Sequence, residues 1–239
     1  MCFFKRKVRI GASGILNGFT DWHCHILPGV DDGFKEIADS LSVLEEYENA
    51  GVSELWLTPH IMEDIPNEVS ALKARFAEFT AAYEADCTRR GVSRPLKLHL
   101  ASENMLDALF EKRLESGDLL PLGERKLLVE TSYFNPPIDL YGIMRRIKSA
   151  GYFPVLAHPE RYIYMKENDY KSLKEMGVLF QLNLPSLVGL YGPGAQSKAN
   201  MLLGKGYYNM YGTDLHRKSV FGRLLEGKVG KKTIEKVAE

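Results

Sequence analysis

Cysteine is scarce in this sequence. The chain of 239 residues contains three cysteines, Cys2, Cys24 and Cys87, an odd number at wide spacing. Small secreted domains that depend on disulfides contain many more cysteines, in paired patterns. The scarcity therefore argues against a disulfide framework and favours a reducing compartment, so we expect a cytoplasmic protein.

The sequence also lacks an excess of charge and a long apolar run. Its 31 basic residues balance 31 acidic residues, which gives no global electrostatic attraction to nucleic acid. Residues 3–9 are basic like the start of a signal peptide, but small residues follow at 11–14, where an apolar run would be needed. A run of about 20 apolar residues is absent as well. We expect no nucleic-acid partner, no export signal and no membrane span.

Three common catalytic motifs are missing. Cysteine-based tyrosine phosphatases place an arginine six positions after the nucleophilic cysteine, whereas this chain has Val8, Val30 and Ser93 at those positions. The Gly-x-Ser-x-Gly elbow of serine hydrolases and the Walker phosphate loop are absent too. These absences exclude a thiolate phosphatase, a serine hydrolase of that type and a P-loop enzyme.

Short apolar segments that end near a polar residue alternate with segments of helical spacing. The expected strands span residues 19–25, 54–60, 96–103, 126–130, 153–158, 178–183 and 207–214. The expected helices span residues 37–50, 69–90, 105–116, 140–150, 170–176 and 195–203. Such alternation predicts βαβ units, because parallel neighbouring strands need a crossover. We therefore expect an α/β protein with a parallel sheet.

An open doubly wound sheet and a closed barrel both fit this alternation. Almost every strand segment carries His, Asp or Glu at or just past its C-terminal end, the face on which barrel enzymes build their sites. An open sheet would gather its site at one crevice. We therefore predict a β/α barrel in a single domain over residues 1–239. Residues 1–18 would be an N-terminal arm, loose rather than bound to an anionic membrane, and residues 220–239 a loosely held tail with a final helix over 233–238.

Histidines and carboxylates follow these strand segments as candidate metal ligands. His23 and His25, at a spacing of two, point to the same side of a strand, whereas Cys24 between them points away. An isolated pair of this kind is more often a packing or surface pair, but here further donors accompany it. The full set is His23, His25, Asp32, His60, Glu103, Glu130, His158, Asp214 and His216. Nine donors exceed the four to six that one ion takes, so we predict two or three ions, and these donors suit Mn, Zn and Fe alike.

The motifs that carry these donors resemble those of a known family. The opening motif covers residues 20–33, Thr-Asp-Trp-His-Cys-His-Ile-Leu-Pro-Gly-Val-Asp-Asp-Gly, and further motifs lie at residues 57–60, 127–133, 157–162 and 212–216. In this order, from about residue 19 to 216, they are similar to the motifs of bacterial capsule-type tyrosine phosphatases of the polymerase and histidinol phosphatase (PHP) superfamily.

The resemblance implies a distorted seven-stranded β/α (TIM-like) barrel of the PHP type, with up to three divalent metals, usually manganese. It implies that all nine donors are metal ligands, with Glu130 and His216 in the catalytic centre. Arg161 falls on the position of a phosphate-binding arginine.

Two positions depart from the family pattern. Ile61 stands where many relatives have a second histidine. The second phosphate-binding arginine, expected shortly after residue 216, is Arg217 or Arg223, and Arg217 is our choice as a substrate-binding residue.

The implied activity is hydrolysis of phosphotyrosine on a partner protein, the tail of a bacterial tyrosine kinase that regulates capsule or exopolysaccharide synthesis. We expect a metal-activated hydroxide to attack phosphorus directly. Arg161 would hold a phosphoryl oxygen through its planar fork. A salt bridge from Arg161 to Glu160 or to a surface carboxylate is the alternative.

Three other functions remain open from the sequence. Within the same superfamily, the chain could be a small-molecule phosphatase like histidinol phosphatase or a phosphodiesterase. From a different class, it could be a catalytically inactive metal-binding module that docks a kinase tail. The oligomeric state is left open.

Overall fold

The structure, a computed structural model, describes residues 7–238, and its centre is a curled parallel sheet. The strands are β1 (Lys7–Arg9), β2 (Thr20–Cys24), β3 (Glu54–Leu57), β4 (His60–Ile61), β5 (Lys97–Leu100), β6 (Glu103–Met105), β7 (Lys126–Glu130), β8 (Phe153–Ala157), β9 (Leu179–Asn183), β10 (Met210–Gly212) and β11 (Lys228–Gly230). Hydrogen bonds order six of them as β10-β9-β8-β7-β6-β4 and three as β2-β3-β5. Pairing within both groups is parallel, which confirms the expected α/β class.

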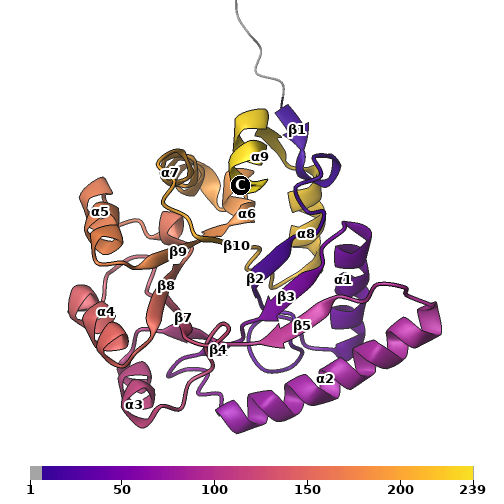
Figure 1. Cartoon of the computed structure of the whole chain (residues 1–239), viewed down its shortest axis with the longest axis horizontal. Coiled ribbons are helices and arrows are strands. Elements are labelled where there is room, and N and C mark those ends of the chain that lie inside the picture. The colour runs from indigo at the N-terminus through magenta and orange to yellow at the C-terminus, as the bar shows by residue number, and fades with distance from the viewer. Residues whose placement is uncertain (1–6, 239) are drawn as a thin grey trace, which may run out of the picture.

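Helices surround the strands, as Figure 1 shows. The α-helices are α1 (Ile37–Asn49), α2 (Val69–Arg90), α3 (Ala108–Ser116), α4 (Leu140–Ser149), α5 (Glu167–Glu175), α6 (Leu184–Leu187), α7 (Gly192–Gly204), α8 (Lys218–Glu226) and α9 (Lys231–Ala238), and short 3-10 helices are η1 (Ile10–Ala12) and η2 (Pro159–Arg161). In Figure 1, α1 and α2 lie on the side of β2, β3 and β5, and α4 lies outside β8. Within residues 7–238, no helix combines the length and the apolar character needed to cross a membrane.

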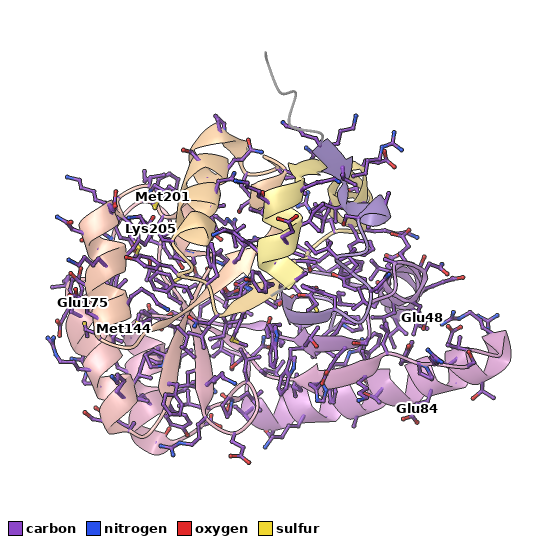
Figure 2. The ribbon with its side chains drawn as sticks, turned by 45° about the horizontal axis from the view of Figure 1, so that its top comes forward. Glu48, Glu84, Met144, Glu175, Met201 and Lys205 are labelled. Carbon is purple, nitrogen blue, oxygen red and sulfur yellow. The ribbon has the colours of Figure 1, made fainter. Side chains whose placement is uncertain are left out.

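The helix α2 illustrates how the sequence pattern becomes structure. Leu72, Phe79 and Tyr83 recur at helical spacing and are buried. Gly91, at a φ of 68°, adopts the left-handed conformation that ends many helices, because it has no Cβ to clash. Tyr83 Oη donates to the carboxylate of Glu48 at 2.7 Å, so the side chain at the end of α1 (Figure 2) fastens α1 to α2.

Two expected strand segments are interrupted. Segment 54–60 forms β3 and β4, and segment 96–103 forms β5 and the start of β6. Pro59, which has no amide proton, lies in the first break. Parallel contact continues nearby, since Glu103 N donates to Pro59 O at 3.1 Å. The breaks place His60 and Glu103 in the six-stranded sheet, although the strands that lead to them belong to the three-stranded one.

The two sheets also meet where β2 and β10 end. Asp214 N donates to His23 O at 2.7 Å, and His25 N donates to Leu215 O at 3.0 Å. These backbone hydrogen bonds hold residues 23–25 and residues 214–215 side by side. The two segments carry or adjoin His23, His25, Asp214 and His216, which are candidate ligands.

A buried polar network supports this junction from below the ligands. Asp21 is fully buried and accepts hydrogen bonds from Tyr47 Oη at 2.9 Å and from Thr213 N at 2.9 Å. A buried carboxylate is costly without partners, so these bonds offset its desolvation. They also tie α1, β2 and the end of β10 together.

The ends of the described chain are packed, contrary to expectation. Residues 1–6, the basic and aromatic start of the expected arm, lie outside the described residues. β1 pairs antiparallel with β11, and Ile10 is buried. The helix α8 buries Phe221 and Leu224 at a spacing of three. The expectation of a loosely held tail is therefore wrong for this part, because a few apolar residues at helical spacing suffice to anchor a lysine-rich segment.

Candidate metal centre

Most candidate ligands lie at or just past the C-terminal ends of parallel strands, whereas His60 and Glu103 begin the short strands that continue the interrupted segments and Asp32 lies in the loop after β2. His23 belongs to β2 and His25 follows it directly, and Glu130 is the last residue of β7. His60 begins β4, Glu103 begins β6, His158 directly follows β8, and Asp214 and His216 follow β10. Because the C-terminal ends of parallel strands meet at one edge, side chains distant in sequence converge.

Two of these residues have unusual backbone conformations. His158 has a φ of 31° and Asp214 a φ of 51°, and they are the non-glycine residues with positive φ among the described ones. Such conformations are unfavourable and cluster at functional sites. Hydrogen bonds hold both, because His158 N donates to Gln181 Oε1 at 3.2 Å and Asp214 N donates to His23 O at 2.7 Å.

Ligand atoms from all nine predicted residues gather in three overlapping groups, each with its atoms within 4.8 Å of one another. The groups are His25, Asp32, His60 and His216; His23, Glu103, His158 and Asp214; and His60, Glu103 and Glu130. Glu103 belongs to two groups, as a bridging carboxylate would. His60 also belongs to two, but a neutral imidazole has one free acceptor nitrogen and binds one ion at a time.

The contacts around Glu103 fit a metal site better than a hydrogen-bond network. Its fully buried Oε2 lies 3.1 Å from His23 Nε2, 3.3 Å from His25 Nε2 and 3.2 Å from His60 Nδ1. Despite these short distances, Oε2 and His60 Nδ1 have no hydrogen bond of acceptable geometry within the described chain. A buried unsatisfied polar atom costs about 1–3 kcal/mol, so a divalent cation that such donors prefer is the fitting partner.

The electrostatics of the protein groups point the same way. Burial lowers the pKa of His23, but the negative charges of Glu103 and Asp214 outweigh it and raise that pKa to about 9. Burial raises the pKa of Glu103, yet its histidine neighbours hold it well below the usual range. Glu103 thus remains ionised and attracts positive charge, which the histidines supply in the protein alone and metal ions would supply when bound.

Residues behind the ligands orient them, and the sequence analysis did not identify these. Asp31 Oδ2 lies 2.8 Å from His25 Nδ1, and Gln181 Oε1 lies 2.9 Å from His23 Nδ1. Partners of this kind fix the ring orientation of metal-binding histidines. Asp31 stood beside the chosen Asp32 in the sequence, and its burial is what distinguishes it. For Gln181, inside a strand, no sequence signal existed.

A cavity of about 490 Å³ opens over the ligands, and we call it the metal cavity. Five candidate ligands line it: Asp32, His60, Glu130, Asp214 and His216. Arg161 and Arg217 line it as well, whereas Arg223 is not among its lining residues in the described chain.

Arg161 is held in a fixed plane at this cavity. Its guanidinium carbon lies 4.4 Å from the ring centre of Tyr133 and 4.1 Å from that of Tyr191. It donates a short hydrogen bond to Asp214, one of the candidate ligands. The alternative salt bridge to Glu160 is absent from the described contacts, and Glu160 is instead buried and accepts from Tyr208.

Cys24 faces away from the ligands, and its replacement by serine tests whether it takes part in catalysis. Its buried thiol donates to Trp56 O at 3.4 Å, and burial raises its pKa well above the ordinary value. Because this raised pKa disfavours a thiolate, we expect Cys24→Ser to retain the phosphatase activity that the family resemblance implies, with kcat within about threefold and any loss reflecting the changed packing. Steady-state kinetics and mass spectrometry of the quenched enzyme check this. A trapped phosphocysteine would contradict it.

Comparison with known proteins agrees with this geometry. A family model described as "Capsular polysaccharide synthesis, CpsB/CapC" matches residues 19–236. Tyrosine-protein phosphatase YwqE of Bacillus subtilis is 27% identical over 202 residues, which cover 82% of this chain and 76% of that protein. Tyrosine-protein phosphatase CpsB of Streptococcus pneumoniae is 27% identical over 209 residues, covering 82% of each.

Solved structures share the fold. One belongs to a study of YwqE from Bacillus subtilis and CpsB from Streptococcus pneumoniae, described as unique metal-dependent tyrosine phosphatases. It superposes with a TM-score of 0.75 at 24% identity and covers 91% of this chain and 90% of that chain. The lactonase Lmo2620 from Listeria monocytogenes follows with a TM-score of 0.55 at 13% identity, covering 95% and 86%. Since the family match extends over nearly the whole chain, the protein belongs to the CpsB/CapC capsular polysaccharide synthesis family.

Proposed function

We propose that this protein is a metal-dependent phosphatase that hydrolyses phosphotyrosine on proteins. The observation that carries the proposal is the convergence of three ligand groups beneath a cavity that Arg161 and Arg217 also line. Family membership and the names of the relatives support this function over a small-molecule phosphatase, a phosphodiesterase or an inactive docking module. The cavity volume of about 490 Å³ is in the range of small-ligand sites.

We assign all nine candidate ligands to two or three divalent ions, in the groups described above. The group of His25, Asp32, His60 and His216 and the group of His60, Glu103 and Glu130 share one imidazole. The ion that His60 does not bind would therefore have fewer ligands and be held less firmly. Manganese is the metal we propose, with iron or zinc as alternatives, since imidazole and carboxylate suit all three. Bound ions would supply a water of lowered pKa and positive charge for the phosphoryl group.

The protein's own residues bind and orient the substrate. Arg161 presents a flat, two-pronged donor, and the rings of Tyr133 and Tyr191 keep its plane fixed before the phosphate arrives. Arg217, exposed at the start of α8, adds a second positive charge at the rim. Tyrosine, with a pKa of about 10, leaves more readily than an alkyl alcohol. The arrangement therefore needs less protonation of the leaving group.

We infer that the strands form a distorted, closed seven-stranded barrel of the TIM-like PHP type within one phosphatase domain. Counting β3 with β4 and β5 with β6 as single interrupted strands supports this, as do the backbone bonds between β2 and the segment after β10. We further propose that the substrate is the tail of a bacterial tyrosine kinase that regulates capsule synthesis, encountered in the cytoplasm.

The function is tested by measuring phosphate release from three substrates with manganese present. We expect the highest kcat/KM for a phosphotyrosine peptide and much lower values for histidinol phosphate and a single-stranded oligonucleotide. A preference for either of the latter two would replace the proposed substrate class with that of the preferred compound.

Metal content gives a prediction that does not depend on activity. After gentle purification with manganese present, elemental analysis is expected to find two or three transition-metal ions per chain. Removal by a chelator should lower Tm, because ions that bind the folded state stabilise it by mass action. One ion or fewer per chain, or a Tm that the chelator leaves unchanged, would contradict the assignment of nine ligands.

A further inference from the structure

A second hollow, of about 520 Å³, adjoins the metal cavity, and we call it the side pocket. Tyr133, Arg161 and Tyr191 line both hollows. The stack of the two tyrosine rings on the guanidinium therefore forms their common wall. A ligand held by Arg161 in the metal cavity lies directly beside the side pocket.

The charged groups of the side pocket are already engaged within the protein. Glu160 accepts hydrogen bonds from Tyr208 Oη at 2.9 Å and from Asn183 N at 3.0 Å. Lys198 Nζ donates to Met165 O at 3.0 Å, and burial lowers the pKa of this lysine. The shared arginine faces a ligand carboxylate. The hydrogen-bonding atoms of Glu160 and Lys198 are thus occupied within the protein, so they are not free to bind a second phosphate.

The remaining lining is apolar and open to solvent. Ile163 is 67% exposed, so its aliphatic side chain is accessible to a ligand in the side pocket. Pro193 and Ala195 on α7 continue this lining. The wall is also preformed, because Ile163 N donates to Tyr133 O at 3.0 Å and ties the two loops together. Burial of this apolar lining against an apolar side chain of a ligand would be favourable, because it removes both apolar surfaces from water.

We propose that the side pocket binds an apolar side chain adjacent to phosphotyrosine in the substrate polypeptide. The inference rests on the proposed function, because it requires a phosphotyrosine in the metal cavity. A polypeptide advances at most about 3.6 Å per residue, so the neighbours of that phosphotyrosine stay close to the wall of Tyr133, Arg161 and Tyr191 that both hollows share. The side pocket then makes this phosphatase select substrates by sequence as well as by phosphorylation.

Three phosphotyrosine peptides of equal length test the selection. One has Asp on both sides of phosphotyrosine, one has Leu on the N-terminal side only, and one has Leu on the C-terminal side only. Burying a leucine side chain in part is expected to raise kcat/KM about tenfold for one of the two leucine peptides over the double-aspartate peptide. The small substrate p-nitrophenyl phosphate, which has no flanking residues, reports on the metal centre alone.

Two glycines of α7 provide a variant and a matched control. Within the described chain, no atom lies within 4 Å of the place where a Cβ would extend from Gly194 or from Gly204. Gly194 lines the side pocket, whereas Gly204 lies about 15 Å further along the same helix. Gly194→Phe should fill the side pocket and reduce the leucine preference to within about twofold, while Gly204→Phe should keep the wild-type preference.

The outcomes separate this inference from the proposed function. If wild-type protein hydrolyses all three peptides equally well, or prefers the double-aspartate peptide, the apolar side pocket is wrong while the phosphatase function stands. The same holds if Gly194→Phe keeps the full leucine preference. If neither the peptides nor p-nitrophenyl phosphate are hydrolysed by metal-loaded wild-type protein, the proposed function fails, and the side pocket assignment fails with it.

Discussion

Replacement of Glu103 by glutamine is expected to lower kcat/KM for a phosphotyrosine peptide by more than about a hundredfold, beyond the loss seen when an outer partner of a metal ligand is removed. Glu103 is fully buried among histidine ring nitrogens and belongs to two of the three ligand groups. Glutamine keeps the shape but removes the charge and turns N–H donors toward metal sites. Metal content, measured by elemental analysis, should fall by at least one ion per chain.

Glu175→Gln is the matched control, because Glu175 on α5 (Figure 2) is 66% exposed and belongs to none of the ligand groups of the described chain. We expect wild-type metal content and kcat/KM within about twofold, since exposed charges contribute little. If Glu103→Gln also kept wild-type metal content and turnover, Glu103 would be a structural carboxylate and the bridging role would pass to another residue.

Replacement of Arg161 is expected to damage phosphate recognition in a graded manner. Lysine keeps the charge but loses the two-pronged donor and the stack between Tyr133 and Tyr191, so we expect a loss in kcat/KM of about tenfold. Alanine removes both and should lose about a hundredfold or more, comparable to the removal of a donor to a reacting oxyanion. Inhibition by inorganic phosphate should weaken in both variants.

Metal content should stay unchanged in the Arg161 variants, because Asp214 retains a hydrogen bond from Asn183 Nδ2 at 3.1 Å. Arg94→Ala, at an exposed position outside both hollows, serves as the control and should behave like wild type. Full activity and unaltered phosphate inhibition in Arg161→Ala would mean that the arginine only neutralises Asp214. Phosphate recognition would then rest on Arg217 or on the metals.

The sequence by itself determined the elements whose signals are local. The helix α2 begins and ends where the spacing of Leu72, Phe79 and Tyr83 and the glycine after it predict. The positions of most candidate ligands at strand ends were also predictable. A short apolar segment followed by His or Glu indicates a buried strand whose C-terminal end lies at that polar residue. Because parallel strands run in the same direction, their C-terminal ends lie at the same edge of the sheet, so the clustering of these residues could be predicted too.

Local signals were too weak at other places. From the sequence we predicted unbroken strands over residues 54–60 and 96–103. Pro59, which has no amide proton, was a local reason to expect a break in the first of them. We also predicted a loosely held tail over residues 220–239, whereas α8 buries Phe221 and Leu224 in the core. In both cases the local pattern did not determine the outcome, because packing against segments distant in the sequence decides it.

Tertiary structure alone decided which groups surround the ligands. Gln181 orients His23 across the sheet, and Asp214, rather than the neighbouring Glu160, receives the hydrogen bond of Arg161. The tyrosine stack on Arg161 and the side pocket behind it likewise join loops far apart in the chain. The physical reason is that hydrogen bonds and ring contacts act over a few ångströms in space, whereas sequence spacing fixes neighbours only within one helix or strand.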